Sequence, residues 1–239
     1  MYYEYKDQKS LLNILNNLKI NQKTNNKYRL IYEKEIKIIQ ISDELTRKVS
    51  LVDEIIRMQP TGNLMIDRLL GYSKIRTVNT SSLFLDADTL CLNKINFKEY
   101  LDGIYLTKRT SNPMINHNFP EHYPEFENRY FKEVMPYLAG IILIKNFKNF
   151  FLDCYKLLLR EPLRLQRWYG DQFIIKKIYD KNPKDFKFFE EDFVYILEFD
   201  GKNKNIDLNL NTKNKLLTFK GSTKKLISPI FDYLTKKKI

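Results

Sequence analysis

The chain has 239 residues, of which 43% are hydrophobic and 14% are aromatic. This composition can fill a buried core, so it excludes a wholly disordered protein. Lys and Arg number 41 against 29 acidic residues, which gives a formal net charge of +12. Such an excess favours a partner rich in phosphate, whether a nucleotide, a nucleic acid or an anionic membrane. The sequence contains no glycine-rich phosphate loop of either common kind.

The cysteine content and the N-terminal sequence indicate the cellular compartment of the protein. Cys91 and Cys154 are isolated and lack the CxxC spacing of zinc sites, so we expect two reduced thiols. The opening stretch MYYEYKDQKS lacks the apolar segment of a secretory signal. No run approaches the ~18 apolar residues of a membrane span. These features predict a cytoplasmic protein.

In the first third of the chain the pattern predicts strands that alternate with helices. Pro60 to Asn63 break the chain, because Pro and Gly interrupt regular structure. Residues 36–41 either form a strand or lead into a helical pattern at 43–58. The other predicted elements are a strand at 2–5, a helix at 8–18, a strand at 28–32 and a helix at 65–72.

Further along the chain the same alternation continues around one long irregular segment. Residues 110–135 contain three Pro, both His and no clear period, which predicts a long loop that shapes a binding pocket. The predicted strands are 82–85, 104–107, 138–144, 194–197 and 216–219, and the predicted helices are 147–159 and 171–179. The alternation predicts an α/β fold with a mostly parallel sheet covered on both faces.

An acidic pair follows the apolar strand 82–85. Asp86 and Asp88 stand two residues apart with Ala87 between them. Ligands of open parallel sheets bind where the strands end at their carboxyl side. Carboxylate oxygens are the ligands that Mg²⁺ and Mn²⁺ prefer. The pattern therefore indicates a divalent cation site, although a strand-end aspartate that caps the next turn would give the same two letters.

The residues around this pair resemble a known family. The segment LFLDADTLCLNKI resembles the YLDADT-type segment of GT-A glycosyltransferases, particularly family 8 and related bacterial or viral sugar transferases. Arg68-Leu69 precedes Asp86 by 18 residues, close to the spacing of an Arg-Leu pair in that family. Residues 137–146 (YLAGIILIKN) are similar to its glycine-containing strand, and Asp171-Gln172 to its Asp-Gln pair at a helix start. The likeness spans roughly residues 60–225.

The resemblance implies a GT-A fold with a mixed, mostly parallel central sheet flanked by helices. It implies one catalytic domain, 1–239, with a nucleotide-binding half at 1–92 and an acceptor-binding half at 93–239. The implied activity moves a sugar from a nucleotide-sugar, UDP-sugar above all, to a glycan, protein or lipid-linked acceptor. The implied cofactor is Mn²⁺ or Mg²⁺. The implied site residues are Asp86 and Asp88 on the metal, Arg68, Ala87, Gly221 and Lys224 on the donor, and Asp171 and Gln172 in catalysis.

One position departs from the family pattern. The family ends with His-x-x-Gly-x-x-Lys, whereas here Thr218 stands in the His position before Gly221 and Lys224. A Thr hydroxyl is a poor metal ligand. Either substrate and water hold more of the cation, or another group, such as His117 or His122, supplies the third ligand.

Two other readings of the sequence remain open. The segment LFLDADTL also satisfies the hhhhDxDxT signature of haloacid-dehalogenase-like phosphatases, with Asp86 as the nucleophile, Thr107 in the second motif and Lys145 in the third. The aromatic and Lys residues of 179–189 could bind nucleic acid, but they are also needed for the core, so no nucleic-acid partner is expected. The basic tail could make a weak peripheral membrane contact.

Overall fold

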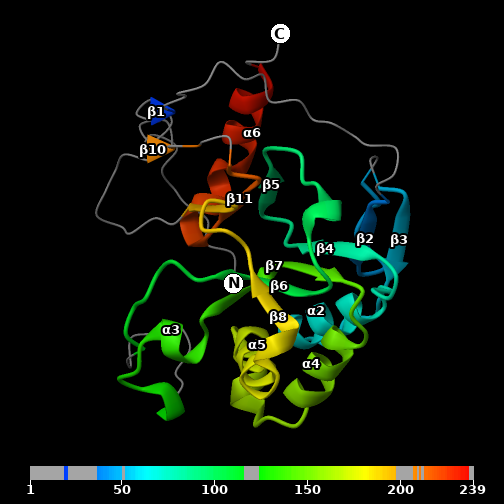
Figure 1. Ribbon diagram of the computed structural model, residues 1–239, viewed down its shortest axis with the longest axis vertical. Helices are drawn as coiled ribbons and strands as arrows, with labels where there is room; N and C mark the ends of the chain where they lie inside the picture. The colour runs from blue at the N-terminus through cyan, green and yellow to red at the C-terminus, as the bar shows by residue number, and fades with distance from the viewer. Residues whose placement is uncertain are drawn as a thin grey trace. The chain divides into compact units, whose positions relative to one another are not determined.

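The computed structural model describes residues 19–20, 37–49, 52–115, 124–197, 207–208, 210 and 213–236 (Figure 1). The chain forms two compact units. The larger unit comprises residues 32–86 and 96–189, and the smaller unit comprises residues 1–31, 87–95 and 190–239. The expected halves, 1–92 and 93–239, divide the chain differently. The elements predicted at 2–5, 8–18 and 28–32 lie outside the described residues.

A four-stranded sheet forms the centre of the larger unit. Its order is β4 (Ser81–Leu85), β7 (Tyr137–Lys145), β6 (Gly103–Lys108) and β8 (Phe186–Phe188). Strand β7 pairs antiparallel with both β4 and β6, and only the β6–β8 pair is parallel. The expectation of a mostly parallel sheet is therefore wrong for this sheet, although the mixed α/β class is confirmed. Apolar runs predict buried strands, but they carry no information on strand direction.

Three helices pack on one face of this sheet (Figure 1). They are α2 (Leu64–Ser73), α4 (Phe150–Leu158) and α5 (Gly170–Lys181). All three were predicted from their apolar period. Helix α2 begins where Asn63 accepts hydrogen bonds from the backbone N–H groups of Met65 and Ile66, which is the usual N-cap chemistry. Their apolar faces enclose a core with the central strands, including Leu69, Ile142 and Ile174.

The segment at 43–58 is not the predicted helix. Strand β2 (Ile39–Ser42) pairs in parallel with β3 (Glu54–Arg57). Asp43 ends β2 because its carboxylate accepts hydrogen bonds from the N–H groups of Leu45 and Thr46, forming a local turn. Leu45 is 94% exposed, so the apolar residue that supports the helical period does not enter a core.

The segment predicted as a long loop at 110–135 contains a small core of its own. It includes the 3-10 helix η2 (Pro124–Phe126) and the short helix α3 (Phe131–Val134), and Met114 bridges to Tyr130. Ile115, Phe131 and Met135 are almost fully buried, in a cluster that also contains Leu165 of the 3-10 helix η3 (Leu163–Gln166). Residues 116–123, with both His, lie outside the described residues.

The smaller unit has a three-stranded sheet in the order β5 (Thr89–Cys91), β11 (Leu216–Phe219) and β9 (Val194–Leu197). Strand β11 runs antiparallel to β5 and parallel to β9. The helix α6 (Ile227–Lys236) follows, and its Ile230 and Leu234 are buried with Leu217 and Phe219. Strands β1 (Lys19–Ile20) and β10 (Asp207–Leu208) form a separate parallel pair. The remaining 3-10 helices are η1 (Phe97–Glu99), η4 (Pro183–Asp185) and η5 (Gly221–Leu226).

The structure also bears on the expected state of the cysteines and on membrane-spanning helices. Cys91 and Cys154 are both free thiols, as expected. Within the described ranges, no helix combines the length and apolar character needed to cross a membrane.

Candidate functional site

The acidic pair lies where the chain passes from one unit to the other. Asp86 follows the last residue of β4 and is the end of a segment of the larger unit, while Ala87 begins a segment of the smaller unit. Asp88 precedes β5 of the smaller unit. The two carboxylates therefore belong to different units, and each has its own surroundings.

Asp86 is held on the larger unit by a backbone bond and by two side chains of α2. Its N–H donates to the carbonyl of Gly140 on β7 at 2.8 Å. The guanidinium of Arg68 lies 3.3 Å from its carboxylate, and the Tyr72 hydroxyl lies 3.5 Å from Oδ1. Arg68 and Tyr72 are four residues apart, which places them on one face of the helix. Both side chains therefore hold the Asp86 carboxylate against the larger unit.

The same Arg68 binds a second carboxylate. Its Nη1 lies 2.6 Å from Oδ2 of Asp171, in the first turn of α5. Asp171 is 0% exposed, and its Oδ1 also accepts the N–H of Gln172 at 2.8 Å. Burial alone lowers the pKa of Arg68, but the carboxylates of Asp171 and Asp86 outweigh it and raise that pKa. Arg68 therefore stays charged and joins the two acidic groups.

This arrangement changes the role that the geometry supports for Asp171. A general base must reach the proton that it removes. The Asp171 carboxylate is fully buried against Arg68, so it does not reach an acceptor in this conformation. Its contacts suit a positioning residue that holds Arg68 toward Asp86.

Gln172, the second predicted catalytic residue, contacts the segment at 110–135. Arg109 donates from Nη2 to the Gln172 side-chain oxygen and from Nε to the carbonyl of Met135 at 2.9 Å. The guanidinium of Arg109 also lies 4.1 Å from the ring centre of Phe131, a cation–π contact. Arg109 thus links Gln172 to the small core around α3.

A β-bulge lies beside Asp86. The register between β6 and β7 shifts at Leu106 and Thr107, and Thr107 donates to the carbonyl of Ile141 at 3.1 Å. Bulges are frequent next to active sites because they redirect the chain. Gly140 precedes Ile141, and a Cβ added there would lie 2.3 Å from Oδ2 of Asp86. A side chain at this position would therefore have to displace the Asp86 carboxylate.

Gly140→Ala is therefore expected to displace the Asp86 carboxylate and to lower the free energy of unfolding by about 1–3 kcal/mol, the usual cost of overpacking. Thermal denaturation of the variant measures the loss. Ser81→Ala, at an exposed position on the neighbouring β4, serves as the control and should change stability by less than about 0.5 kcal/mol. Equal stability of Gly140→Ala and the wild type would contradict the close approach.

In the smaller unit, Asp88 is paired on one carboxylate oxygen only. Its side chain is 11% exposed, and Oδ2 lies 2.7 Å from Nζ of Lys224. Its Oδ1 is buried and has no hydrogen-bond partner among the described residues. A buried charged oxygen without a partner is costly, and a water molecule or an ion at the site would satisfy it. The donor set therefore fits a bound cation.

The backbone around Lys224 is anchored by Thr223. The Thr223 hydroxyl donates to the carbonyls of Leu197 at 2.9 Å and of Lys220 at 2.7 Å, and it accepts the Lys220 N–H. Gly221 begins η5 directly after this anchor. Asp88 is tied to the same region, since its carbonyl accepts the N–H of Phe219 at 3.1 Å. These bonds hold Asp88 and η5 together within one unit.

Thr218 lies in the interior of the small sheet. It is 0% exposed and pairs with Thr89 across the β5–β11 ladder, where the two hydroxyls are 3.4 Å apart. In the described ranges, no group of three or more His, Cys, Asp or Glu side chains is arranged to hold a metal. His117 and His122, the proposed substitutes, lie outside the described residues. The described carboxylates would thus leave most of a cation's coordination to substrate and water.

Two residues of these clusters were not predicted from the sequence. Tyr72 could have been found, because it follows Arg68 by four residues on a predicted helix. Thr223 offers no comparable signal, since its role depends on the carbonyl of Leu197, which is distant in the sequence. Ala87, predicted in the donor site, is exposed between the two carboxylates.

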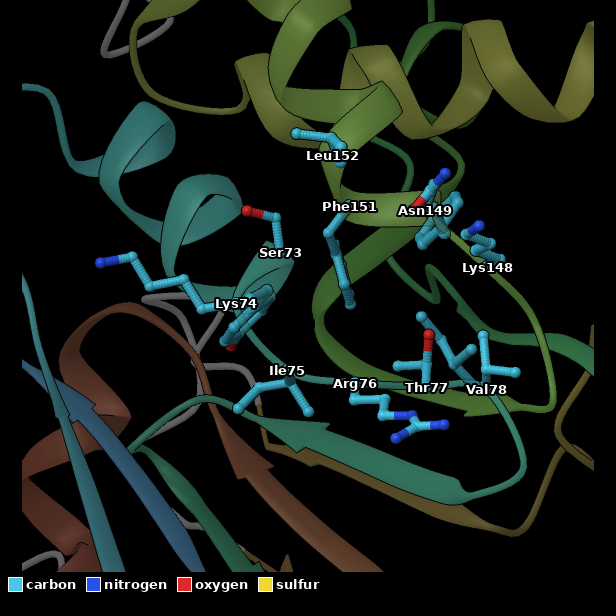
Figure 2. A pocket seen from close by; sticks show the side chains of 13 residues that line it. Ser73, Lys74, Ile75, Arg76, Thr77, Val78, Lys148, Asn149, Phe151 and Leu152 are labelled. Carbon is cyan, nitrogen blue, oxygen red and sulfur yellow. The ribbon is translucent and has the colours of Figure 1, made fainter.

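A cavity of about 440 Å³ also occurs in the larger unit, lined by the end of α2, the start of α4 and residues 74–78 between α2 and β4 (Figure 2). Tyr72, which reaches Asp86, is part of its lining. None of the site residues predicted from the sequence lines it. The cavity therefore shares Tyr72 with the Asp86 cluster and shares no described residue with the Asp88 cluster.

Comparison of the sequence with protein-family models and with curated proteins gives no match. The assignment of a function therefore depends on the residues and contacts described above.

Proposed function

We propose that the chain is a cation-dependent glycosyltransferase of the GT-A type that takes a nucleotide-sugar, with a UDP-sugar as the first choice. The observation that carries the proposal is the half-satisfied carboxylate of Asp88. One oxygen contacts the ammonium of Lys224, and the other is buried with no hydrogen-bond partner within the described ranges. The carboxylate of Asp88 could bind a cation. The half-exposed Lys224 beside it could bind a phosphate.

In this proposal, Asp86 and Asp88 hold Mn²⁺ or Mg²⁺. Two residues in this spacing lie at most about 7 Å apart at their Cα atoms, because of covalent geometry. When bound, the cation would neutralise charge on the departing nucleoside diphosphate. Lys224 and the backbone at Gly221 would bind the diphosphate. The raised pKa of Arg68 keeps its charge beside Asp86, and Asp171 fixes its position.

The acceptor side is assigned to the segment at 110–135 and to Gln172. Arg109 connects the Gln172 side chain to this segment, so movement of the segment would be transmitted to Gln172. We propose a glycan, protein or lipid-linked hydroxyl as the acceptor, in a cytoplasmic setting, with no nucleic-acid partner. Membrane contact by the basic tail would be weak and peripheral.

The phosphatase alternative is less well supported by the larger unit. A haloacid-dehalogenase-like site needs its third-motif Lys beside the nucleophilic Asp86. Lys145 pairs with Ser81 at the start of β4, whereas Asp86 follows the end of that strand. Five residues of strand separate the two positions by roughly 16 Å. Lys145 instead donates to the carbonyl of Tyr100.

The proposal is tested by measuring thermal shifts with a panel of nucleotide-sugars, with and without Mn²⁺. A UDP-sugar with Mn²⁺ should raise the melting temperature more than either component alone, because both bind the folded state. Cation-dependent release of UDP from the same donor should accompany the shift. Hydrolysis of simple phosphoesters without any response to nucleotide-sugars would favour the phosphatase instead. A response to oligonucleotides with steep salt dependence would favour nucleic-acid binding.

A further inference from the structure

The ion pair between Lys224 and Asp88 occupies the carboxylate to which the proposed cation would bind. The ammonium of Lys224 neutralises Asp88 through Oδ2. It leaves Oδ1 buried, with no hydrogen-bond partner in the part of the chain that the structure describes. One ammonium therefore substitutes only partly for the divalent ion that the proposal places on this carboxylate.

We propose that Lys224 is a displaceable counter-ion of Asp88: cation binding releases its ammonium, and the released ammonium then binds the diphosphate. This inference rests on the proposed function. Lys224 then has two alternative partners, Asp88 and the diphosphate. Binding of the cation therefore raises the affinity for the nucleoside diphosphate, and binding of the nucleoside diphosphate raises the affinity for the cation.

The two side chains differ in their freedom to move. The Lys224 side chain is 48% exposed, whereas that of Asp88 is 11% exposed. Lysine carries its charge on a flexible four-carbon stem. The backbone of η5 is fixed by the Thr223 hydroxyl, which bonds Leu197 and Lys220. The ammonium can therefore change partner by side-chain rotation while η5 and Asp88 remain in place.

Electrostatic forces favour movement of the Lys224 ammonium from Asp88 to the diphosphate once a cation is bound. A divalent ion on Asp88 repels the neighbouring ammonium, while a diphosphate attracts it. Without a cation, a diphosphate that recruits Lys224 must leave Asp88 without its counter-ion in a buried position, which is costly. With a cation, that cost is already removed. By linkage, the cation must strengthen diphosphate binding by the same factor as diphosphate strengthens cation binding.

The test is isothermal titration of the full chain and its Lys224→Met variant with Mn²⁺ alone, with UDP alone, and with UDP in saturating Mn²⁺. Loss of the ion pair should tighten Mn²⁺ binding by about 2- to 5-fold, the factor expected for a partly exposed pair. Loss of the diphosphate contact should weaken UDP binding by about 10-fold or more in Mn²⁺. Without Mn²⁺ the weakening should be smaller, because the wild-type ammonium is then held by Asp88.

The control is Lys225→Met, the same charge change at the next residue of η5. Equal tightening of Mn²⁺ binding in both variants would overturn the inference, because net charge would explain it. Unchanged Mn²⁺ affinity in Lys224→Met, or an equal loss of UDP affinity with and without Mn²⁺, would also overturn it, since Lys224 would then be a fixed diphosphate ligand. A wild type that binds neither Mn²⁺ nor UDP would instead reject the proposed function, and the inference with it.

Discussion

Replacing Arg68 with Met is expected to lower the free energy of unfolding by about 3–5 kcal/mol, the typical result of removing one partner of a buried ion pair. Arg68 is the charged group that bonds Asp171, which is 0% exposed, at 2.6 Å. Without it, Asp171 would be a buried charge that keeps the hydrogen bond from the N–H of Gln172. Asp86 would also lose its contact with the Arg68 guanidinium. Chemical denaturation gives the difference in stability directly.

Arg76→Met provides the matched control, since Arg76 is exposed in the same unit and its replacement should cost less than about 0.5 kcal/mol. The double variant Arg68→Met, Asp171→Asn should recover part of the loss, because the buried group would then be neutral. A single Arg68→Met variant as stable as Arg76→Met would show that Arg68 does not join the two carboxylates in solution.

If the proposed function holds, replacing Asp88 with Asn is expected to lower cation-dependent sugar transfer by at least about a hundredfold, because the cation that Asp88 would hold supplies several kcal/mol of transition-state stabilisation. Folding should not suffer. Among the described residues Oδ1 of Asp88 has no partner, and the ion pair with Lys224 that the change removes is partly exposed, so we expect stability to change by no more than about 1 kcal/mol. Release of UDP from a UDP-sugar, followed against Mn²⁺ concentration, measures the first effect, and thermal denaturation without cation measures the second.

Asp232→Asn, a change of the same charge at an exposed position of α6, controls for the net charge of the smaller unit and should retain activity. Turnover by Asp88→Asn with an unaltered Mn²⁺ dependence would count against the cation site. A large loss of stability in the cation-free variant would show that Asp88 serves the fold and that its orphaned oxygen is satisfied.

Local chemistry made several elements predictable. The apolar run that became β7 and the three-to-four-residue spacing of α2 depend on neighbours in the chain, so periodicity is sufficient to find them. The segment at 43–58 shows where this fails. Its apolar spacing is compatible with a helix, but the Asp43 carboxylate bonds the N–H groups of Leu45 and Thr46 and starts a turn, and β3 then pairs with β2.

The sequence by itself determined the order of most elements, the position of Asp86 and Asp88 at a strand end, and the residue types that a cation and a diphosphate would need. Only the tertiary structure decided which charges meet. Arg68 and Asp171 are 103 residues apart, and Lys224 reaches Asp88 through η5. Strand direction in the central sheet was also decided there. The reason is physical: local periodicity reports which residues are buried, whereas ion pairs and strand direction depend on how distant segments pack.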